Sequence, residues 1–427
     1  MKAAPARVAR EMTDEDWDAL AFEVRQTFSP AAPLDETALF AGRRAQLQKV
    51  LDATVERGKH VVLFGERGVG KTSMSRLLSK LFPPTARHIY SIREQADPSD
   101  DFDSIWRKVF KDIWVAVDRG DGQAEVQRPL DQLYPESIRP DDVRRELEAV
   151  FKANEIPIIV IDEIDKIKDK NTMSLMANTI KFLSDYSVNV TVILVGVAND
   201  VNELISEHQS ISRCLEQVLM PRMSIAERKE ILEKTLPRLD MKIEPDGLFK
   251  IIYLSRGLPS YVHALGQAAA LSAIGRKSLL IKVADVDAAV GRVLEKSEES
   301  VQESYDRATR SNRNDNLYKQ VILAAAMAEP DDRGAFAASA LCQPLTSILR
   351  REKEVPISAF HQHLQKFVTP ERGDILVRRG REGSYRYRFS DPMMQPYIIM
   401  KGIEQRLIDP AALEILSFPQ QPRFPTI

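Results

Sequence analysis

The sequence is poor in the residues that build disulfide scaffolds and metal clusters. Of its 427 residues, only Cys214 and Cys342 are cysteines and six are histidines, and the histidines do not cluster with the cysteines. Two cysteines exclude a disulfide framework and fit a reducing compartment, so we expect a cytoplasmic protein. His361 and His363 stand two positions apart and would lie on different faces of a helix, which argues against a metal site there.

Long apolar runs and a strong charge of one sign are missing too. No stretch of about 18 apolar residues occurs, so no membrane-spanning helix is expected. The first residues, MKAAPARVAREMTDEDW, lack the apolar region of a secretory signal. The formal net charge is −2, which argues against a wholly basic nucleic-acid-binding protein but leaves room for a local basic patch. Hydrophobic residues make up 44% of the chain, as in an ordinary globular protein of about two to four domains.

The clearest motif is a glycine-rich segment between a predicted strand, Val61–Phe64, and a predicted helix, Lys71–Leu81. The segment GERGVGKT fits GxxxxGK[S/T] at every required position. Glycines let backbone amides close around phosphate oxygens, and the start of a helix favours an anion. Lys71 would contact the β- and γ-phosphates, and Thr72 would ligate Mg²⁺. The alternative is an ordinary strand–turn–helix. The predicted nucleotide-binding residues of the motif are Gly65, Glu66, Arg67, Gly68, Val69, Gly70, Lys71, Thr72 and Ser73.

An acidic pair follows the next continuous apolar run, IPIIVID, which is typical of a strand buried on both faces. Asp162 closes this run and would hold Mg²⁺ through water, and Glu163 would polarise the attacking water. A solvated turn is the alternative interpretation. Asp165 is expected to cap a helix or to lie on the surface.

A second apolar run, VTVILVG at 190–196, ends just before Asn199. We expect the Asn199 amide to orient water against the γ-phosphate, although a lone asparagine is also a common turn residue. Strands that alternate with helices predict an α/β fold with a parallel sheet, here of the P-loop NTPase type.

The remaining segments predict the domain organisation. Thr13 could cap a short helix with Trp17, Leu20, Val24 and Phe28 on one side. Residues 118–131 are polar and predict a loop, and residues from 224 to 310 show only helical patterns. The predicted parts are an N-terminal extension (1–34), an ATPase core (35–223), a helical lid (224–310), a linker (311–316), a winged helix (317–406) and a tail (407–427).

The chain resembles the AAA+ and STAND P-loop ATPases, and within them the origin-recognition-like and archaeal-type ATPases with a C-terminal winged helix. The residues that carry the resemblance are the Gly65–Thr72 loop, the Asp162–Glu163 pair and Asn199. Upstream, LFAGRRAQLQKVL resembles the family's "GRxxxL" box at Gly42, Arg43 and Leu47, with Arg44 in place of the usual glutamate. The resemblance implies that Arg43 packs near adenine and that the nucleotide is ATP.

Two further residues follow from the resemblance. Members of the family place an arginine finger where Arg213 precedes a short strand, and this finger reaches the γ-phosphate of a neighbouring subunit. Arg222 competes for that role, and Arg213 could equally be a surface arginine. Gly257-Leu258-Pro259 resembles the GLP motif of STAND ATPases, in which the proline region packs on the nucleotide; Pro259 also suits the first turn of a helix.

The region 317–406 resembles a winged helix with a basic wing at 375–389. In a strand pair, Arg386 and Arg388 would share one face, and the neighbouring tyrosines the other. This pattern suits DNA phosphates, but such modules also serve protein contacts. The candidate DNA-contacting residues are Arg378, Arg379, Arg381, Arg386 and Arg388.

The resemblance leaves two functions open. One is a Mg²⁺-dependent ATPase that works as a STAND-like switch: it would form homo-oligomers with ATP and control a protein partner in prokaryotic regulation or defence. The other is a DNA-binding AAA+ ATPase of the initiator-loader or transposition-regulator type. The GLP motif favours the switch, and the basic wing favours DNA.

Overall fold

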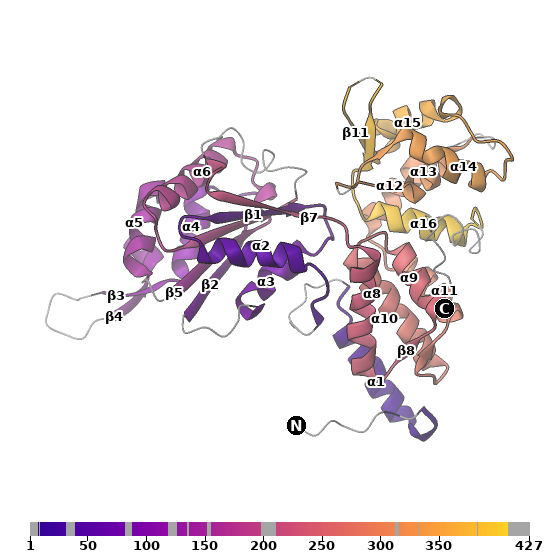
Figure 1. Ribbon diagram of the computed structural model, residues 1–427, viewed down its shortest axis with the longest axis horizontal. Helices are drawn as coiled ribbons and strands as arrows, with labels where there is room; N and C mark the ends of the chain where they lie inside the picture. Colours follow the sequence, from indigo (N-terminus) through magenta and orange to yellow (C-terminus); the bar gives the residue numbers. More distant parts are fainter. Residues whose placement is uncertain are drawn as a thin grey trace, which may run out of the picture. The chain divides into compact units, whose positions relative to one another are not determined.

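We analysed a computed structural model of the chain (Figure 1). The residues that the structure describes are 7, 9–30, 39–81, 88–117, 126–134, 136–151, 155–197, 211–311, 316–331, 333–381 and 383–408. The chain divides into two compact units. The core unit holds residues 33–66 and 70–221, and the C-terminal unit holds 1–32, 67–69 and 222–427.

The core unit is built on a five-stranded parallel sheet, which confirms the predicted α/β class. The strand order is β2-β5-β6-β1-β7. All registers are parallel, so the carboxyl ends of the five strands meet at one edge of the sheet. The strands are β1 (His60–Gly65), β2 (His88–Gln95), β5 (Glu155–Asp162), β6 (Thr191–Gly196) and β7 (Leu215–Met220).

Helices cover both faces of this sheet (Figure 1). The inner strands β1 and β6 are buried along their whole length, because a parallel sheet packs helices on both sides. One large apolar cluster joins strand residues such as Val62 and Ile159 to Trp106 and Phe110 of α4. The helices are α2 (Arg44–Val55), α3 (Lys71–Leu81), α4 (Phe102–Lys111), α5 (Pro140–Val150) and α6 (Lys170–Asp185), with the short 3-10 helices η3 (Leu130–Leu133) and η4 (Ile164–Lys166).

The prediction of a loop over 118–131 is wrong at its C-terminal end. A two-stranded antiparallel hairpin, β3 (Trp114–Val117) and β4 (Val126–Pro129), branches off after α4. Val115 packs on the apolar cluster of the core unit, while Trp114 is exposed on the opposite face. The second strand contains proline and glutamine and few apolar residues, so its sequence does not show a strand pattern. Its stability comes from pairing with the neighbouring strand.

The C-terminal unit begins with the predicted N-terminal helix. Thr13 caps α1 (Asp14–Thr27) in a capping box: Asp16 N–H donates to Thr13 Oγ1 (3.2 Å), and Thr13 N–H donates to Asp16 Oδ2 (2.8 Å). Trp17, Leu20 and Val24 are buried as expected. The end of α1 packs on the lid, where the Gln267 amide donates to the Phe28 carbonyl (3.1 Å).

The lid is helical, with one short parallel strand pair that the sequence pattern did not predict. The capping serine of α8, Ser224, accepts from Glu227 N–H (3.2 Å), as in other helices that start with a capping box. The lid elements are α8 (Ile225–Thr235), η6 (Leu236–Leu239), β8 (Lys242–Ile243), α9 (Pro245–Leu254), α10 (Pro259–Gly275), β9 (Leu280–Ile281), α11 (Val283–Glu295) and α12 (Glu299–Thr309).

The last part of the chain follows the element order expected of a winged helix. A three-stranded antiparallel sheet of order β10-β12-β11 combines with three short helices, and α16 closes the module. Phe336–Ala337 forms the first strand of this sheet. The elements are α13 (Tyr318–Met327), β10 (Phe336–Ala337), α14 (Cys342–Ile348), α15 (His361–Phe367), β11 (Leu376–Arg379), β12 (Arg386–Phe389) and α16 (Met394–Glu404). Within the described ranges, no helix combines the length and apolar character needed to cross a membrane.

Candidate nucleotide site

The glycine-rich loop starts where β1 meets its neighbour β7. A Cβ atom on Gly65 would lie 2.4 Å from the carbonyl oxygen of Met220, so no other residue fits there without moving the backbone. The helix α3 then begins at Lys71. Strand, tight turn and helix N-terminus therefore occur in the order that phosphate binding requires.

Lys71 is buried although it carries a charge. Its side chain folds back over the loop, and Nζ donates to the carbonyl oxygens of Gly65 (3.1 Å) and Glu66 (2.7 Å). Burial lowers the pKa of Lys71 to about 8, and the negative charges of Asp165 and Asp162 offset part of this effect. A partly desolvated ammonium held at this loop is well placed to donate hydrogen bonds to phosphate oxygens.

Asp162 lies at the same edge of the sheet, at the end of β5, and is almost fully buried. Its Oδ1 accepts from the backbone N–H of Glu163 (2.9 Å), and its Oδ2 forms an ion pair with Arg93 Nη2 (2.6 Å). Arg93 comes from β2, the edge strand that pairs with β5. These two partners hold the buried carboxylate in one orientation.

Glu163 follows directly, in a left-handed backbone conformation with φ of 58°. This conformation is uncommon for a residue with a side chain. The carboxylate is held by two neighbours: Lys166 Nζ lies 2.6 Å from Oε2, and the Gln95 amide donates to the same oxygen. Gln95 is the last residue of β2, directly opposite Asp162 in the register.

Sequence reasoning missed both Arg93 and Gln95. The available signal was the polar run Arg93-Glu94-Gln95 at the end of a predicted strand. These residues reach the site only because β2 lies beside β5, and the sequence around them does not show which strands are neighbours. Of the two roles predicted for Asp165, the helix cap is wrong, because α6 is capped by Asp169, and the side chain is partly exposed. Instead its Oδ1 accepts from Val197 N–H (2.7 Å) and links the ends of β5 and β6.

The other predicted binding residues are distributed around the loop. Thr72 and Ser73 occupy the first turn of α3 and are partly buried, and Glu66 is buried. The tip of the loop, Arg67–Val69, groups with the C-terminal unit, where Arg67 forms ion pairs with Glu298 (3.0 Å) and Asp391 (3.2 Å). The Arg67 side chain is thus engaged within the C-terminal unit.

Arg43 and Arg213 belong to the core unit, and Asn199 lies outside the described residues. Arg43 is buried before the first residue of α2 and has a left-handed backbone, with φ of 62°. Arg213 is exposed and pairs with Asp185 (2.5 Å) just before β7 begins. The start of β7 lies at the edge of the sheet opposite Gly65, so Arg213 stands away from the glycine-rich loop of its own chain.

The GLP segment has a structural explanation. A Cβ atom on Gly257, which has φ of 85°, would lie 2.7 Å from Cβ of Arg222, and the Gly257 carbonyl accepts from Met223 N–H (2.8 Å). Pro259 occupies the first turn of α10, where its missing N–H is harmless. The motif thus joins the segment after β7 to the lid, and the proposed packing of Pro259 on a nucleotide stays a prediction.

The wing presents arginines on one face, as the alternation predicts. Tyr387 is buried between the partly or fully exposed Arg386 and Arg388. Arg379 stands directly opposite Arg386 across the strand pair. Two like charges in that arrangement are unfavourable unless an anion lies near; Asp331 supplies one, 3.1 Å from Arg386. Arg378 stacks over Tyr385 at 4.3 Å, and Arg381 is exposed in the turn.

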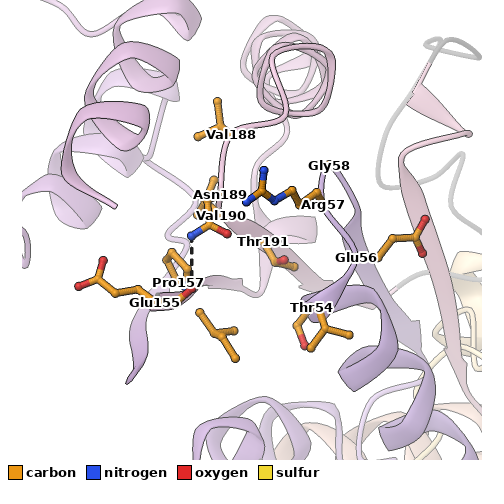
Figure 2. A pocket seen from close by; sticks show the side chains of 12 residues that line it. Thr54, Glu56, Arg57, Gly58, Glu155, Pro157, Val188, Asn189, Val190 and Thr191 are labelled. Atoms are coloured by element: carbon orange, nitrogen blue, oxygen red, sulfur yellow. Dashed lines mark hydrogen bonds between the residues drawn. The ribbon is translucent and has the colours of Figure 1, made fainter. Parts of the chain in front are cut away.

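A hollow of about 140 Å³ at the opposite edge of the sheet is a less suitable ligand site. Figure 2 shows that its side chains carry mixed charges and that the Asn189 amide donates to the Glu155 carbonyl (3.2 Å). Arg57 and Glu56 come from the turn after α2. Among the described residues that line it there is no glycine-rich loop and no carboxyl end of a strand, whereas the Gly65 edge has both.

These features define a P-loop nucleotide-binding protein. A parallel sheet carries a GxxxxGK[S/T] loop between β1 and α3, and an acidic pair ends the strand β5 on the same edge. Residues 54–205 match the family model described as "AAA domain". This part of the chain is therefore an AAA domain, as the resemblance predicted.

Comparisons with other proteins add only broad similarity. No curated protein matches the sequence. Solved structures similar to the chain include the Aeropyrum pernix ORC2 protein in ADPNP–ADP complexes (14% identity, 90% of this chain and 98% of that one, TM-score 0.48). They also include the Pyrococcus abyssi Walker-type ATPase PABY2304 (15%, 87% and 99%, TM-score 0.47) and Thermotoga maritima RuvB, a Holliday junction branch migration motor (14%, 88% and 99%, TM-score 0.43). At these values the likeness carries no functional argument.

Proposed function

We propose that the protein is a Mg²⁺-dependent ATPase that couples ATP binding and hydrolysis to self-assembly and to the control of a partner. The observation that carries the proposal is the buried Lys71 ammonium beside Asp162 at the carboxyl edge of the sheet. A desolvated cation and a buried carboxylate next to a helix N-terminus are the parts that a metal–triphosphate complex needs.

The donor set suits Mg²⁺. Thr72 offers a hydroxyl and Asp162 a carboxylate, both hard oxygen ligands. No group of three or more metal-binding side chains occurs among the residues with described positions, which fits an ion that keeps waters and binds substrate phosphates. In the structure, Arg93 Nη2 forms an ion pair with the Asp162 carboxylate (2.6 Å). Mg²⁺, when bound, would neutralise phosphate charge.

The chain's own residues would divide the remaining work. Lys71 would bind the β- and γ-phosphates, and Glu163 would take a proton from the attacking water. Asn199 would orient this water. Gln95 and Lys166 hold the Glu163 carboxylate, so the base must be released from these partners before it acts.

The position of Arg213 supports assembly as the output. It lies at the edge opposite its own loop, so a role in catalysis requires a second chain. An arginine supplied in trans can accelerate hydrolysis by about 10³ or more. ATP-dependent association would then complete the site, as the STAND-like switch requires.

The test is the mass of the Glu163→Gln protein with and without ATP·Mg²⁺ and duplex DNA. We expect retained ATP binding, nearly abolished turnover and ATP-driven assembly that is indifferent to DNA. Glu155→Gln is the matched control, because Glu155 begins the same strand at the other edge of the sheet, and it should hydrolyse ATP normally. If turnover survives in Glu163→Gln, the assignment of the base is wrong. A monomer under every condition would overturn the assembly function.

A DNA-acting ATPase is the second candidate, supported by the arginine face of the wing. We expect duplex binding that weakens with salt and that is lost in the double variant Arg386→Glu/Arg388→Glu. Arg351→Glu is the control: Arg351 is an exposed arginine of the same module, outside the wing. Equal affinity of both variants, with no salt dependence, would remove DNA contact by the wing.

A further inference from the structure

The C-terminal unit contains an arginine-rich cavity far along the chain from the glycine-rich loop. Its volume is about 300 Å³. The walls come from the segment after β7, from α8 and α9 of the lid, and from residues 327–331, which follow α13 of the winged helix. Lid and winged helix thus both contribute to one hollow of nearly the size that small-ligand sites have.

Three arginines line this cavity: Arg222, Arg228 and Arg256. Each donates to neutral oxygens. Arg256 Nη2 donates to the carbonyls of Ala328 (2.9 Å) and Met327 (3.3 Å). Arg228 donates to Ser224 O (3.2 Å) and to the carbonyl of Ile252. Arg222 donates to the Arg256 carbonyl (3.2 Å) and to the buried Gln395.

The positive charges of Arg228 and Arg256 are poorly compensated. Within the described part of the chain, neither Arg228 nor Arg256 forms an ion pair. Burial lowers the pKa of Arg228 to about 10, and the charges of Arg256 and Arg222 lower it further. Burial also lowers the pKa of Arg256, and Arg222 adds to that effect. Glu329 opposes both shifts and Glu227 opposes that of Arg228. Asp331 also lines the cavity, where it forms an ion pair with Arg386 (3.1 Å).

Two aromatic residues of α9 also line the cavity. Phe249 and Tyr253 lie one turn apart on α9 with their rings stacked at 6.4 Å, and the Arg256 guanidinium stands over Tyr253 at 5.5 Å. Guanidinium forks bind phosphate oxygens in pairs, and aromatic faces accept planar rings. Structural capping of carbonyls would need no such clustering of cations, which repel one another at a cost.

We propose that this cavity binds a small phosphate-bearing anion, either a free polyphosphate or a nucleotide. Arg228 and Arg256 would take the phosphate, and Phe249 and Tyr253 would contact a ring if the ligand has one. Because the walls belong to the lid and to the winged helix, the bound ligand would tie these two modules together. This site is separate from the glycine-rich loop and does not depend on the proposed ATPase activity.

The experiment titrates pyrophosphate and AMP into the full chain carrying Lys71→Ala, which disables the phosphate site of the loop. Calorimetry should give a dissociation constant below about 1 mM that weakens with salt. Adding Arg228→Gln should weaken binding at least tenfold. Arg292→Gln, at an exposed arginine of α11 outside the cavity, should leave it unchanged. Pyrophosphate binding as tight as AMP binding identifies a free polyphosphate, and tighter AMP binding identifies a nucleotide.

Two results would overturn the proposal. One is the absence of binding by either anion at about 10 mM, far above the expected constant. The other is equal binding by the Arg228→Gln and Arg292→Gln proteins. Arg228→Lys guards against misfolding: it keeps the charge but loses the fork, so a folded protein with intermediate affinity supports phosphate recognition. Unchanged affinity in this variant together with the glutamine variant would assign the arginines to carbonyl capping alone.

Discussion

Replacing Lys71 with methionine should stabilise the nucleotide-free protein near neutral pH. The side chain is 8% exposed, and burial lowers its pKa from 10.5 to about 8. The native state therefore holds this proton less tightly than the unfolded chain does. At about 1.4 kcal/mol for each pKa unit, the native state loses about 3 kcal/mol by keeping Lys71 charged. Methionine has a similar length and no charge, so its substitution removes this loss.

The sign of the effect fixes its pH dependence. The loss is complete below pH 8, because Lys71 is then charged in both states. It disappears between pH 8 and 10.5, where the native state gives up the proton first. The wild-type free energy of unfolding should thus rise relative to that of Lys71→Met across this window. The variant's advantage should be about 3 kcal/mol at pH 7 and near zero above pH 10.5.

Urea unfolding from pH 7 to 11, followed by tryptophan fluorescence, to which the buried Trp106 of the core unit contributes, measures this difference. Lys49→Met is the control, because Lys49 is an exposed lysine of α2 in the same unit, and its curve should parallel the wild type. A non-hydrolysable ATP analogue should stabilise the wild type and not Lys71→Met, since the same ammonium binds phosphate. If the unfolding free energies of Lys71→Met and the wild type changed in parallel with pH, the argument that burial destabilises the charged Lys71 ammonium would be refuted.

Three further predictions concern the core unit. His60 is fully buried with its pKa lowered to about 3, and Nδ1 accepts from Val192 N–H (3.1 Å). The wild type should therefore lose about 2 kcal/mol of unfolding free energy between pH 6.5 and 5, and His60→Asn should not show this loss in urea unfolding. Equal acid sensitivity of the two proteins would contradict this. Gln95→Ala frees the Glu163 carboxylate from one hydrogen bond, so basal phosphate release should rise about threefold to tenfold; a fall in kcat at constant KM would instead make Gln95 a positioning residue. Gly65→Ala should cost about 1–3 kcal/mol and weaken nucleotide binding, judged by thermal melting against Gly275→Ala, where an added Cβ meets no atom within 4 Å.

Local sequence patterns were sufficient to predict those parts of the site whose residues follow one another along the chain. Gly65 to Thr72 lie between a strand and a helix that their own apolar residues predict, and Asp162 ends an apolar run that can only be a buried strand. The cap at Thr13 and the alternation around Tyr387 are equally local, and the structure agrees with both.

The sequence by itself therefore determined the phosphate loop, the buried strand that ends at Asp162 and the helix cap at Thr13, because glycine conformation, helix capping and apolar patterning act over a few residues. Only the tertiary structure decided what surrounds the acids: the sheet order places β2 beside β5 and so brings Arg93 to Asp162 and Gln95 to Glu163. It likewise gathered Arg222, Arg228 and Arg256 against residues 327–331. Contacts between segments distant in sequence depend on which surfaces bury one another, and no local pattern encodes that choice.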